Sequence, residues 1–413
     1  MNATNKAHGR ALTRRWAEQR WLIDNIIRAN GVDWDQPRSI SYNAPCGPEA
    51  NADFASIREK VKKYADIGPA FEATARRREA KAKAAEEEGA LVTARQNYFM
   101  AAIHYAAAQW PHDENNDTNL MLNERKRACY TRYGELADHK VEAAWVPFGD
   151  KALPGWFHLP QGYDGGRLPA IWAIPGMDGF KETGVAMYGD RWLQRGIAVL
   201  TLEGPGQYES AVNGIHVSMP NWIEAGHAVM AWLRARSEVD PERIGVVGQS
   251  MGSFFGTIVA ATEPRFKACA VMATCLEPGM RTIFEEACPT FKRRFMYMSG
   301  FTDEGAFDQF CRTLTWEGHV EKIRAPFLCV AGEADELAPM EHTERLIAAL
   351  KSKKRLVVYQ DCRHSVGNVP STNLGPTPAV MIADWMSARL SGKPFQSERW
   401  FVQSNGQVVR TPL

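Results

Sequence analysis

The sequence predicts an α/β protein, with a mostly parallel sheet that helices cover on both faces and a helical segment before it. After residue 140, short runs rich in β-branched residues alternate with helical stretches. These runs are apolar throughout, which is typical of parallel strands buried on both faces. Before residue 140 the chain is rich in Ala, Arg, Lys and Glu, which favour helices. We therefore expect a helical cap or lid segment over residues 1–140 and an α/β domain over residues 141–413.

Helices are expected at three places in the helical segment. Residues 71–88 are dense in strong helix formers and end before Gly89, a common residue just past a helix end. Residues 91–109 carry large apolar side chains among several alanines, and Pro111 ends that helix. Residues 119–136 have the same helical character.

The α/β domain shows alternating strand and helix patterns. The expected strands are residues 156–159, 168–174, 196–202, 244–247, 266–273, 327–330 and 356–359. The expected helices are residues 221–236, 252–261 and 379–390. This alternation indicates a parallel sheet with helical connections.

Composition narrows the function classes. The formal net charge is +1, so electrostatics give no reason to expect nucleic acid or a membrane surface as a partner. No run approaches the roughly 18 apolar residues of a membrane span. Residues 1–19 lack the apolar stretch of a secretory signal, so we expect a cytoplasmic protein. The eight cysteines are scattered without a CxxC pair, which predicts reduced thiols, no metal and no other cofactor.

The motif Gly248-Gln249-Ser250-Met251-Gly252 carries the clearest chemical signal. It fits G-x-S-x-G, with an apolar strand before it and a helix after it. A serine on such a tight turn has strained backbone angles, and glycines on either side leave room for the neighbouring backbone. We expect Ser250 to be a nucleophile exposed at the carboxyl edge of the sheet. The alternative is a Gly-rich turn with an incidental serine.

A serine hydroxyl needs a base to become reactive, and the base needs a group that orients it. Asp335 follows the expected strand at residues 327–330, and His364 lies in the loop after the last expected strand. The order Ser, Asp, His along the chain is that of the α/β-hydrolase fold. We therefore expect His364 as the base and Asp335 as the acid that orients it. The alternative acids are Glu333 and Glu336.

Two backbone amides are expected to form an oxyanion hole. The Met251 N–H lies at a helix N-terminus directly after the serine. The loop Pro175-Gly176-Met177-Asp178-Gly179 follows an early strand, where this fold carries its second donor. Gly176 would let the backbone approach a ligand closely, so the Met177 N–H is the expected second donor. The alternative is an ordinary Gly-rich turn.

Taken in chain order, these motifs resemble those of a known family. The resemblance is to 2,6-dihydroxypseudooxynicotine hydrolase and its relatives, which include bacterial esterases of the fermentation-respiration-switch type and fungal hydrolases that shorten polyketide pigments. It covers about the last two thirds of the chain and extends weakly into the helical part around residues 104–107 and 110–112. The motifs are Pro175-Gly176-Met177-Asp178 with Lys181-Glu182, Glu203-Gly204-Pro205-Gly206-Gln207, the motif around Ser250, Gly332-Glu333-Ala334-Asp335-Glu336, His364 with Asn368, and Ala383-Asp384-Trp385-Met386.

The resemblance implies the α/β-hydrolase fold with Ser250, Asp335 and His364 as its catalytic triad. It also implies that the helical segment packs over the hydrolase core and helps to form the pocket, and that the protein is a homodimer. Two positions depart from the family's pattern. Ser253 stands where a second glycine is frequent, and Glu203 stands where the family often has Asp. Because of these two departures, the resemblance does not determine the identity of the substrate.

Aromatic side chains from two regions are candidates for binding the substrate. If they line a cavity, the substrate is an aromatic or bulky ketone or ester; the alternative is that they are ordinary core. The candidates are Tyr98, Phe99 and Trp110 in the helical segment, and Phe295 and Tyr297 in the stretch between residues 277 and 305.

The sequence therefore predicts a serine hydrolase that attacks the carbonyl group of a small ketone or ester. The resemblance slightly favours hydrolysis of a carbon–carbon bond beside a ketone, with ester hydrolysis as the alternative, because one triad serves both reactions. An interaction protein built on an inactive hydrolase core is the alternative from another class. Competent residues at all three triad positions argue against it.

Overall fold

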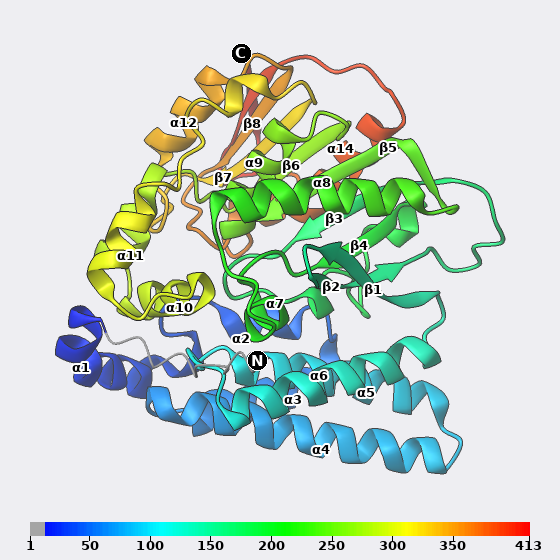
Figure 1. Ribbon diagram of the computed structural model, residues 1–413, viewed down its shortest axis with the longest axis vertical. Coiled ribbons are helices and arrows are strands. Elements are labelled where there is room, and N and C mark those ends of the chain that lie inside the picture. The colour runs from blue at the N-terminus through cyan, green and yellow to red at the C-terminus, as the bar shows by residue number, and fades with distance from the viewer. Residues whose placement is uncertain (1–12) are drawn as a thin grey trace.

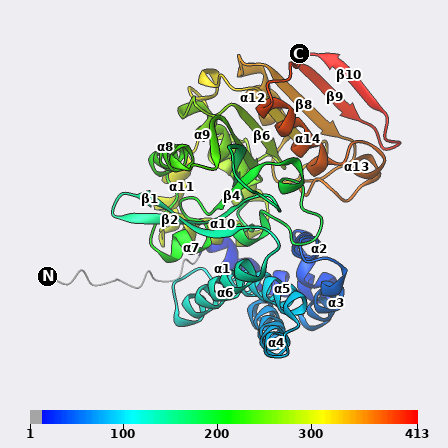
Figure 2. The same ribbon diagram turned by 90° about the vertical axis from the view of Figure 1, so that its right-hand side faces the viewer.

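A layer of helices precedes the sheet along the chain. The computed structural model describes residues 13–413; residues 1–12, part of the stretch examined above for a secretory signal, lie outside the described residues. Figures 1 and 2 show α3 to α6 as a layer beside the sheet, on the side where α7 and α10 lie. The helices before the first strand are α1 (Arg14–Asn30), α2 (Arg38–Asn43), α3 (Asn51–Lys60), α4 (Ile67–Glu87), α5 (Leu91–Gln109) and α6 (Asp117–Leu136).

A single sheet runs through the rest of the described chain. Its order is β1-β2-β4-β3-β5-β6-β7-β8-β9-β10. Pairing is parallel from β4 through β9, and antiparallel for β1 with β2, β2 with β4, and β9 with β10. The strands are β1 (Val141–Phe148), β2 (Lys151–His158), β3 (Leu168–Ile174), β4 (Ala198–Leu202), β5 (Val239–Gln249), β6 (Ala268–Met272), β7 (Phe327–Gly332), β8 (Lys354–Tyr359), β9 (Glu398–Val402) and β10 (Val408–Pro412).

Helices cover both faces of the sheet. On one face, the Trp222 ring of α8 stacks on Phe255 of α9, with ring centroids 4.3 Å apart. On the other face, α14 brings Met386 against Gly245 of β5. The helices of this part are α7 (Tyr208–Val212), α8 (Met219–Ala235), α9 (Met251–Thr262), α10 (Pro289–Ser299), α11 (Glu304–Cys311), α12 (Met340–Ala349), α13 (Pro370–Leu374) and α14 (Pro378–Leu390).

The hydrophobic core has three parts that follow these layers. One lies between the sheet and the α8–α9 face and continues into α10 and α11. A second fills the α14 face. The third lies within the helical layer and reaches the sheet domain through Trp156, Phe180 and Tyr208. The helical layer is therefore joined to the sheet domain by buried apolar contacts as well as by the chain.

The predicted fold class is confirmed, and every strand and helix expected from the sequence has a counterpart. Residues 91–109 and 168–174 match α5 and β3 to the residue. The sequence patterns did not predict the outer strands β1, β9 and β10, the helices α1 to α3, or the helices α7, α10, α11 and α13. Outer strands contact one neighbour or meet solvent, so their sequences lack the continuous apolar runs that reveal central strands.

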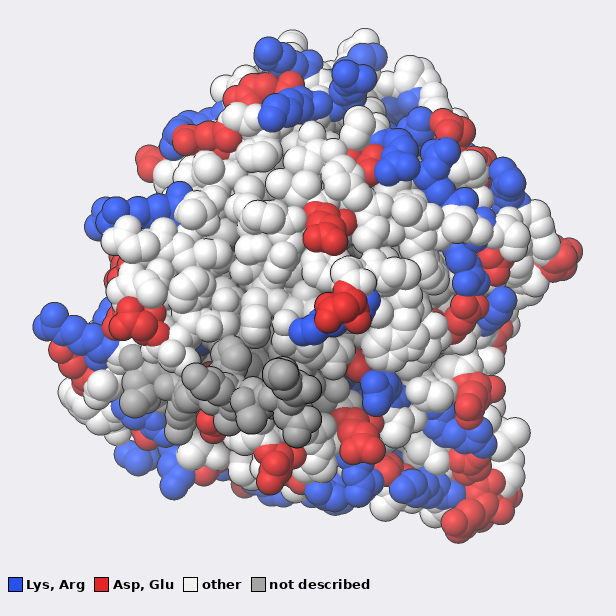
Figure 3. All heavy atoms as spheres, in the orientation of Figure 1, with Lys and Arg blue, Asp and Glu red and all other residues white. Residues whose placement is uncertain are grey.

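On the face seen in Figure 3, Lys and Arg side chains lie interspersed with Asp and Glu side chains, mostly around the rim of the face. No broad field of a single sign gathers on that face, as a net charge of +1 implies. Within residues 13–413, none of the helices is long and apolar enough to cross a membrane.

Candidate active site

Ser250 occupies a sharp turn between a strand and a helix. β5 ends at Gln249 and α9 begins at Met251, and Ser250 between them has φ 54° and ψ −124°. Few side chains adopt this conformation without support from the surrounding structure. A Cβ on Gly248 would overlap the Gly252 carbonyl group, and a Cβ on Gly252 would lie 2.5 Å from the Ile174 oxygen. The turn therefore requires both glycines of the G-x-S-x-G motif.

The side chains of Ser250, His364 and Asp335 form one hydrogen-bonded line, which we call the Ser–His–Asp row. His364 Nε2 lies 2.8 Å from Ser250 Oγ, and His364 Nδ1 lies 3.0 and 3.1 Å from the two Asp335 oxygens. An ionised carboxylate only accepts hydrogen bonds, so Nδ1 carries the imidazole proton. Nε2 is then free to accept the proton of the Ser250 hydroxyl group.

Of the three carboxylates after β7, Asp335 is the one that meets the imidazole. Its Oδ1 also accepts hydrogen bonds from the backbone amides of Leu337 and Ala338, at 2.9 and 3.0 Å, which fix its orientation. Glu336 accepts from the backbone N–H of His364 at 3.0 Å, and Glu333 accepts from that of Asp361 at 3.2 Å. These two glutamates therefore hold the loop that carries the imidazole.

The His364 environment predicts an alkaline activity profile. Burial alone would lower the pKa of this imidazole, but the Asp335 carboxylate raises it well above the ordinary value of 6.5. A protonated imidazole cannot take the serine proton, so kcat/KM is expected to rise with pH through a midpoint above 6.5. Measuring kcat/KM from pH 5 to 10 tests this expectation. A midpoint at or below the ordinary value would contradict it.

The loop after β3 lies directly against Ser250. A Cβ on Gly176 would sit 2.9 Å from Ser250 Cβ and 3.2 Å from the Gln249 oxygen. Only a glycine allows this approach, which brings the backbone of the next residue, Met177, close to Ser250. Met251, the other expected donor, is the first residue of α9, where backbone N–H groups have no partner within the helix.

Cys275 is a neighbour of the row that the sequence analysis missed. Its Sγ lies 3.6 Å from Ser250 Oγ and 3.9 Å from His364 Nε2. Its backbone N–H donates to Ser253 Oγ at 2.9 Å, so the serine at a position where glycine is frequent anchors the next loop. Cys275 follows β6, which pairs with β5. Its place after the neighbouring parallel strand was the signal that would have revealed it.

The aromatic candidates for substrate binding lie in different surroundings. Trp110 reaches the loop after β3, where its Nε1 donates to Asp178 Oδ1 at 2.6 Å. Tyr98 donates to Glu86 at 2.8 Å, and Phe99 packs within the helical layer. Phe295 packs against Phe284 and Phe307, and the Tyr297 hydroxyl donates to Asn115 at 2.7 Å. The structure thus brings Trp110 to the site loops, and the substrate-binding role of all five side chains stays a prediction.

Buried charges join the site loops to the helical layer. Lys181, Glu182, Glu203 and Glu209 are fully buried, as is Lys126 of α6. Lys181 Nζ lies 2.7 Å from Glu209, 3.1 Å from Glu182 and 3.2 Å from Glu203, and Lys126 Nζ lies 3.7 Å from Glu203. Burial alone would raise the pKa of Glu209, but the lysines lower it to about 2. Lys181, Glu182 and Glu203, which the sequence indicated only as motif residues of the resembling family, therefore have a structural role in this buried cluster.

Replacing Lys181 with methionine is expected to lower the free energy of unfolding by about 3–5 kcal/mol, because it leaves buried carboxylates without their main partner. Chemical denaturation followed by tryptophan fluorescence measures the change. The matched control is Lys267→Met, which removes an exposed ion pair with Glu242 and should change the free energy of unfolding far less. Equal losses in the two variants would contradict the assignment.

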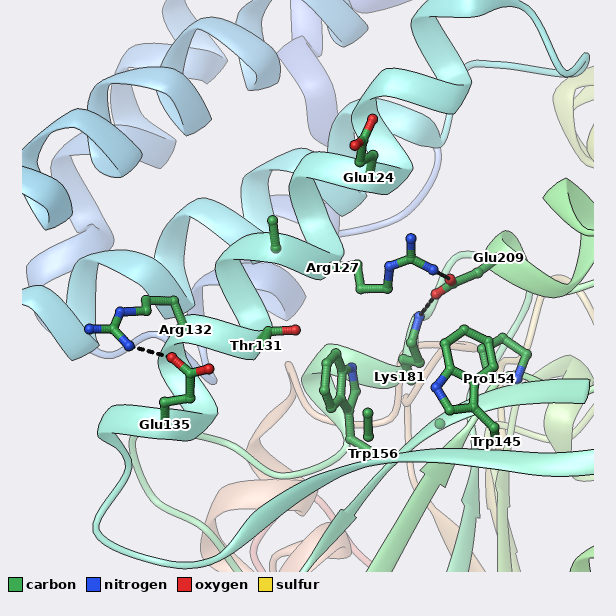
Figure 4. Close-up of a pocket in the computed structure, with 13 residues that line it drawn as sticks. Glu124, Arg127, Thr131, Arg132, Glu135, Trp145, Pro154, Trp156, Lys181 and Glu209 are labelled. Atoms are coloured by element: carbon green, nitrogen blue, oxygen red, sulfur yellow. Dashed lines mark hydrogen bonds and ion pairs between the residues drawn. The ribbon is translucent and has the colours of Figure 1, made fainter.

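A hollow of about 550 Å³ opens beside this cluster, between α6 and the β1–β2 hairpin. Figure 4 shows Trp145 and Trp156 on its strand side and Arg127 on its helix side. At its deep end, Glu209 pairs with Arg127 at 3.0 Å and with Lys181 at 2.7 Å. Since these charges already satisfy one another, we assign the hollow no ligand.

Comparison with known proteins gives two matching families, each over part of the chain. They are the prolyl oligopeptidase family over residues 223–385 and the X-Pro dipeptidyl-peptidase (S15) family over residues 94–289. Among curated proteins, α/β hydrolase xenA of Xenoacremonium sinensis is 29% identical over 275 residues, which are 62% of this chain and 62% of xenA. α/β hydrolase gkaG of Penicillium citrinum is 30% identical over 251 residues, 58% of each chain. The chain thus spans about three fifths of the length of these relatives.

Solved structures extend the similarity into the helical layer. The crystal structure of 2,6-dihydroxy-pseudo-oxynicotine hydrolase aligns with a TM-score of 0.74 at 22% identity, over 86% of this chain and 97% of its own. AbyA5 aligns with a TM-score of 0.61 at 16% identity, over 86% of this chain and 96% of its own. The chain therefore has the α/β-hydrolase fold with a helical N-terminal segment. More narrowly, it is similar to the fungal α/β hydrolases named above, and the resemblance predicted from its motifs is confirmed.

Proposed function

We propose that this α/β hydrolase is a serine hydrolase in which Ser250 is the nucleophile, His364 the base and Asp335 the acid that orients it. The observation that carries the proposal is the Ser–His–Asp row, with 2.8 Å from Ser250 Oγ to His364 Nε2 and 3.0 Å from Nδ1 to Asp335. A nucleophile, a base in hydrogen-bond reach and a group orienting that base are the three parts that such catalysis needs.

The reaction begins when Ser250 Oγ attacks a carbonyl carbon of the substrate and passes its proton to His364 Nε2. Asp335 stabilises the resulting imidazolium. The carbonyl oxygen becomes an oxyanion, which the backbone N–H groups of Met177 and Met251 hold. One such donor contributes roughly 3–4 kcal/mol to the transition state.

The bond from the carbonyl carbon to the leaving group then breaks, and its electron pair departs with the leaving group. The His364 imidazolium gives its proton to that group, and an acyl-enzyme on Ser250 remains. Water, deprotonated by His364, attacks the acyl carbon and releases a carboxylic acid and free Ser250. An alkoxide leaving group makes the protein an esterase. An enolate or electron-rich aryl carbanion makes it a carbon–carbon bond hydrolase.

We favour an aromatic or bulky ketone as the substrate and carbon–carbon bond hydrolysis as the reaction. Support comes from the likeness to 2,6-dihydroxy-pseudo-oxynicotine hydrolase, which aligns over both the sheet domain and the helical layer. Trp110, one of the predicted substrate-binding residues, contacts the loop after β3 through its indole N–H. Carboxylic ester hydrolysis is the second candidate, because the same row attacks either carbonyl group.

A panel of 1-phenyl-1,3-butanedione and p-nitrophenyl esters separates the two reactions. The proposal expects the diketone to give a carboxylic acid and a ketone in equal amounts, with no products from Ser250→Ala. Turnover of esters alone would favour the esterase. No turnover of either class, together with an unreactive Ser250, would favour the inactive interaction protein.

Two expectations from the sequence stay predictions. Sedimentation velocity tests the homodimer that the resemblance implies. Localisation of the full chain in its own cells tests the cytoplasmic assignment.

A further inference from the structure

Asp178, the residue after the expected oxyanion donor Met177, receives four hydrogen bonds. Trp110 Nε1 donates to its Oδ1 at 2.6 Å, and Arg38 Nη2 donates to its Oδ2 at 2.7 Å. Its backbone carbonyl accepts from the hydroxyls of Tyr42 and Tyr208, at 2.9 and 3.1 Å. Three of these donors belong to the helical layer: Arg38 and Tyr42 lie in α2, and Trp110 follows α5.

These donors form a rigid and buried set. Arg38, Tyr42, Trp110 and Tyr208 are each at most 4% exposed. The Arg38 guanidinium lies 3.8 Å from the centre of the Trp110 ring and also pairs with Asp35. A buried guanidinium needs such partners, because leaving it unpaired costs several kcal/mol. The set therefore holds Asp178 in one place.

Gln207, the chain neighbour of Tyr208, holds the start of the same loop. Gln207 Nε2 donates to the carbonyl oxygens of Pro175 and Gly176, at 2.6 and 3.3 Å. Gly176 touches Ser250, as described above. Met177 lies between the clamped Gly176 and the clamped Asp178, so the direction of its N–H depends on both clamps.

The same segment of the helical layer also contacts the loop that carries the base. Gln36 accepts from Ser365 Oγ at 2.7 Å and donates to Glu336 at 3.3 Å. Glu336 in turn accepts from the backbone N–H of His364. Residues 36–42 thus bridge the two loops that flank Ser250.

We propose that Arg38, Tyr42 and Trp110 are positioning residues for the oxyanion hole, through which the helical layer sets the reactivity of Ser250. They act through Asp178 on the Met177 amide and touch no reacting atom. The proposal rests on the proposed function and goes beyond it, because it makes the helical layer part of the catalytic geometry rather than a cover alone.

Trp110→Phe and Tyr42→Phe test this inference, since each keeps an aromatic ring and removes one donor. The matched control is Tyr105→Phe, which removes an equally buried phenol from α5 that donates to Glu79 at 2.6 Å. With the member of the substrate panel that the wild type hydrolyses, we expect kcat to fall about 10-fold or more in both test variants, because a small misplacement of a catalytic group is costly. KM should change less than twofold, and the control should keep its kcat.

Inhibition by 2,2,2-trifluoroacetophenone distinguishes a positioning role from a loss of stability, because lower stability alone would not change the inhibition constant of the folded enzyme. This ketone forms an oxyanion adduct with an active serine, so its inhibition constant should rise by the same factor as kcat/KM falls. Losses no larger than those of Tyr105→Phe, a rise in KM alone, or unchanged inhibition would overturn the inference.

Labelling of Ser250 by a fluorophosphonate separates this inference from the proposed function. A wild-type protein that is not labelled contradicts both. A wild-type protein that is labelled, with test variants as active as the control, contradicts the positioning role alone.

Discussion

Ser250→Ala is expected to lower kcat/KM by at least about 10⁴-fold, because it removes the hydroxyl group that forms the acyl-enzyme. Alanine keeps the Cβ and the backbone of the turn, and the two glycines that the turn requires remain. The unfolding midpoint should therefore stay close to that of the wild type. Initial rates on the hydrolysed member of the substrate panel measure the effect.

Ser237→Ala is the control for this change, because Ser237 is an exposed serine whose hydroxyl meets only the neighbouring Glu238. Its activity should equal that of the wild type. If Ser250→Ala keeps more than a small fraction of wild-type activity while folded, the nucleophile lies elsewhere.

Asp335→Asn is expected to lower kcat by about 10⁴-fold, although the asparagine has almost the same shape. Its Oδ1 would keep the hydrogen bonds from Leu337 and Ala338, which turns the new amide N–H₂ toward His364 Nδ1. An amide donor there favours the tautomer with the proton on Nε2, which cannot take the serine proton. The pH midpoint of the residual kcat/KM should also fall, because the carboxylate that raises the His364 pKa is gone.

Glu333→Gln is the control for the acid, since Glu333 was one of the two alternative acids, with Glu336, and is exposed. It should retain activity within a few fold of the wild type. A large loss in Glu333→Gln with little loss in Asp335→Asn would reverse the assignment.

Local sequence signals predicted the central fold well. The strands from β3 to β8 each contain a buried apolar run. Gly248 and Gly252 reveal the turn between β5 and α9 because its crowding allows no side chain there. The candidates for the Ser–His–Asp row followed from the same logic. Parallel strands end at one edge, so residues after β5, β7 and β8 can meet even though they lie far apart in the chain.

The contacts between the helical layer and the site could not be predicted in this way. α2 is six residues long, too short to show a helical period, and the roles of Arg38 and Tyr42 depend on Asp178, more than 130 residues away. The sequence also did not show which aromatic side chains pack in the core and which contact the site loops. Phe99 and Trp110 are equally buried, yet one packs within the helical layer and the other reaches a site loop. Burial alone does not distinguish a ring within the helical layer from a ring that contacts a site loop.

The most direct test of the central claim is peptide mass spectrometry after reaction with a fluorophosphonate, which phosphonylates a serine only where a base activates it. The account predicts one adduct, on the peptide that contains Ser250, and no adduct in Ser250→Ala or His364→Ala. An unmodified Ser250 in the folded wild type, or equal labelling after removal of His364, would contradict it.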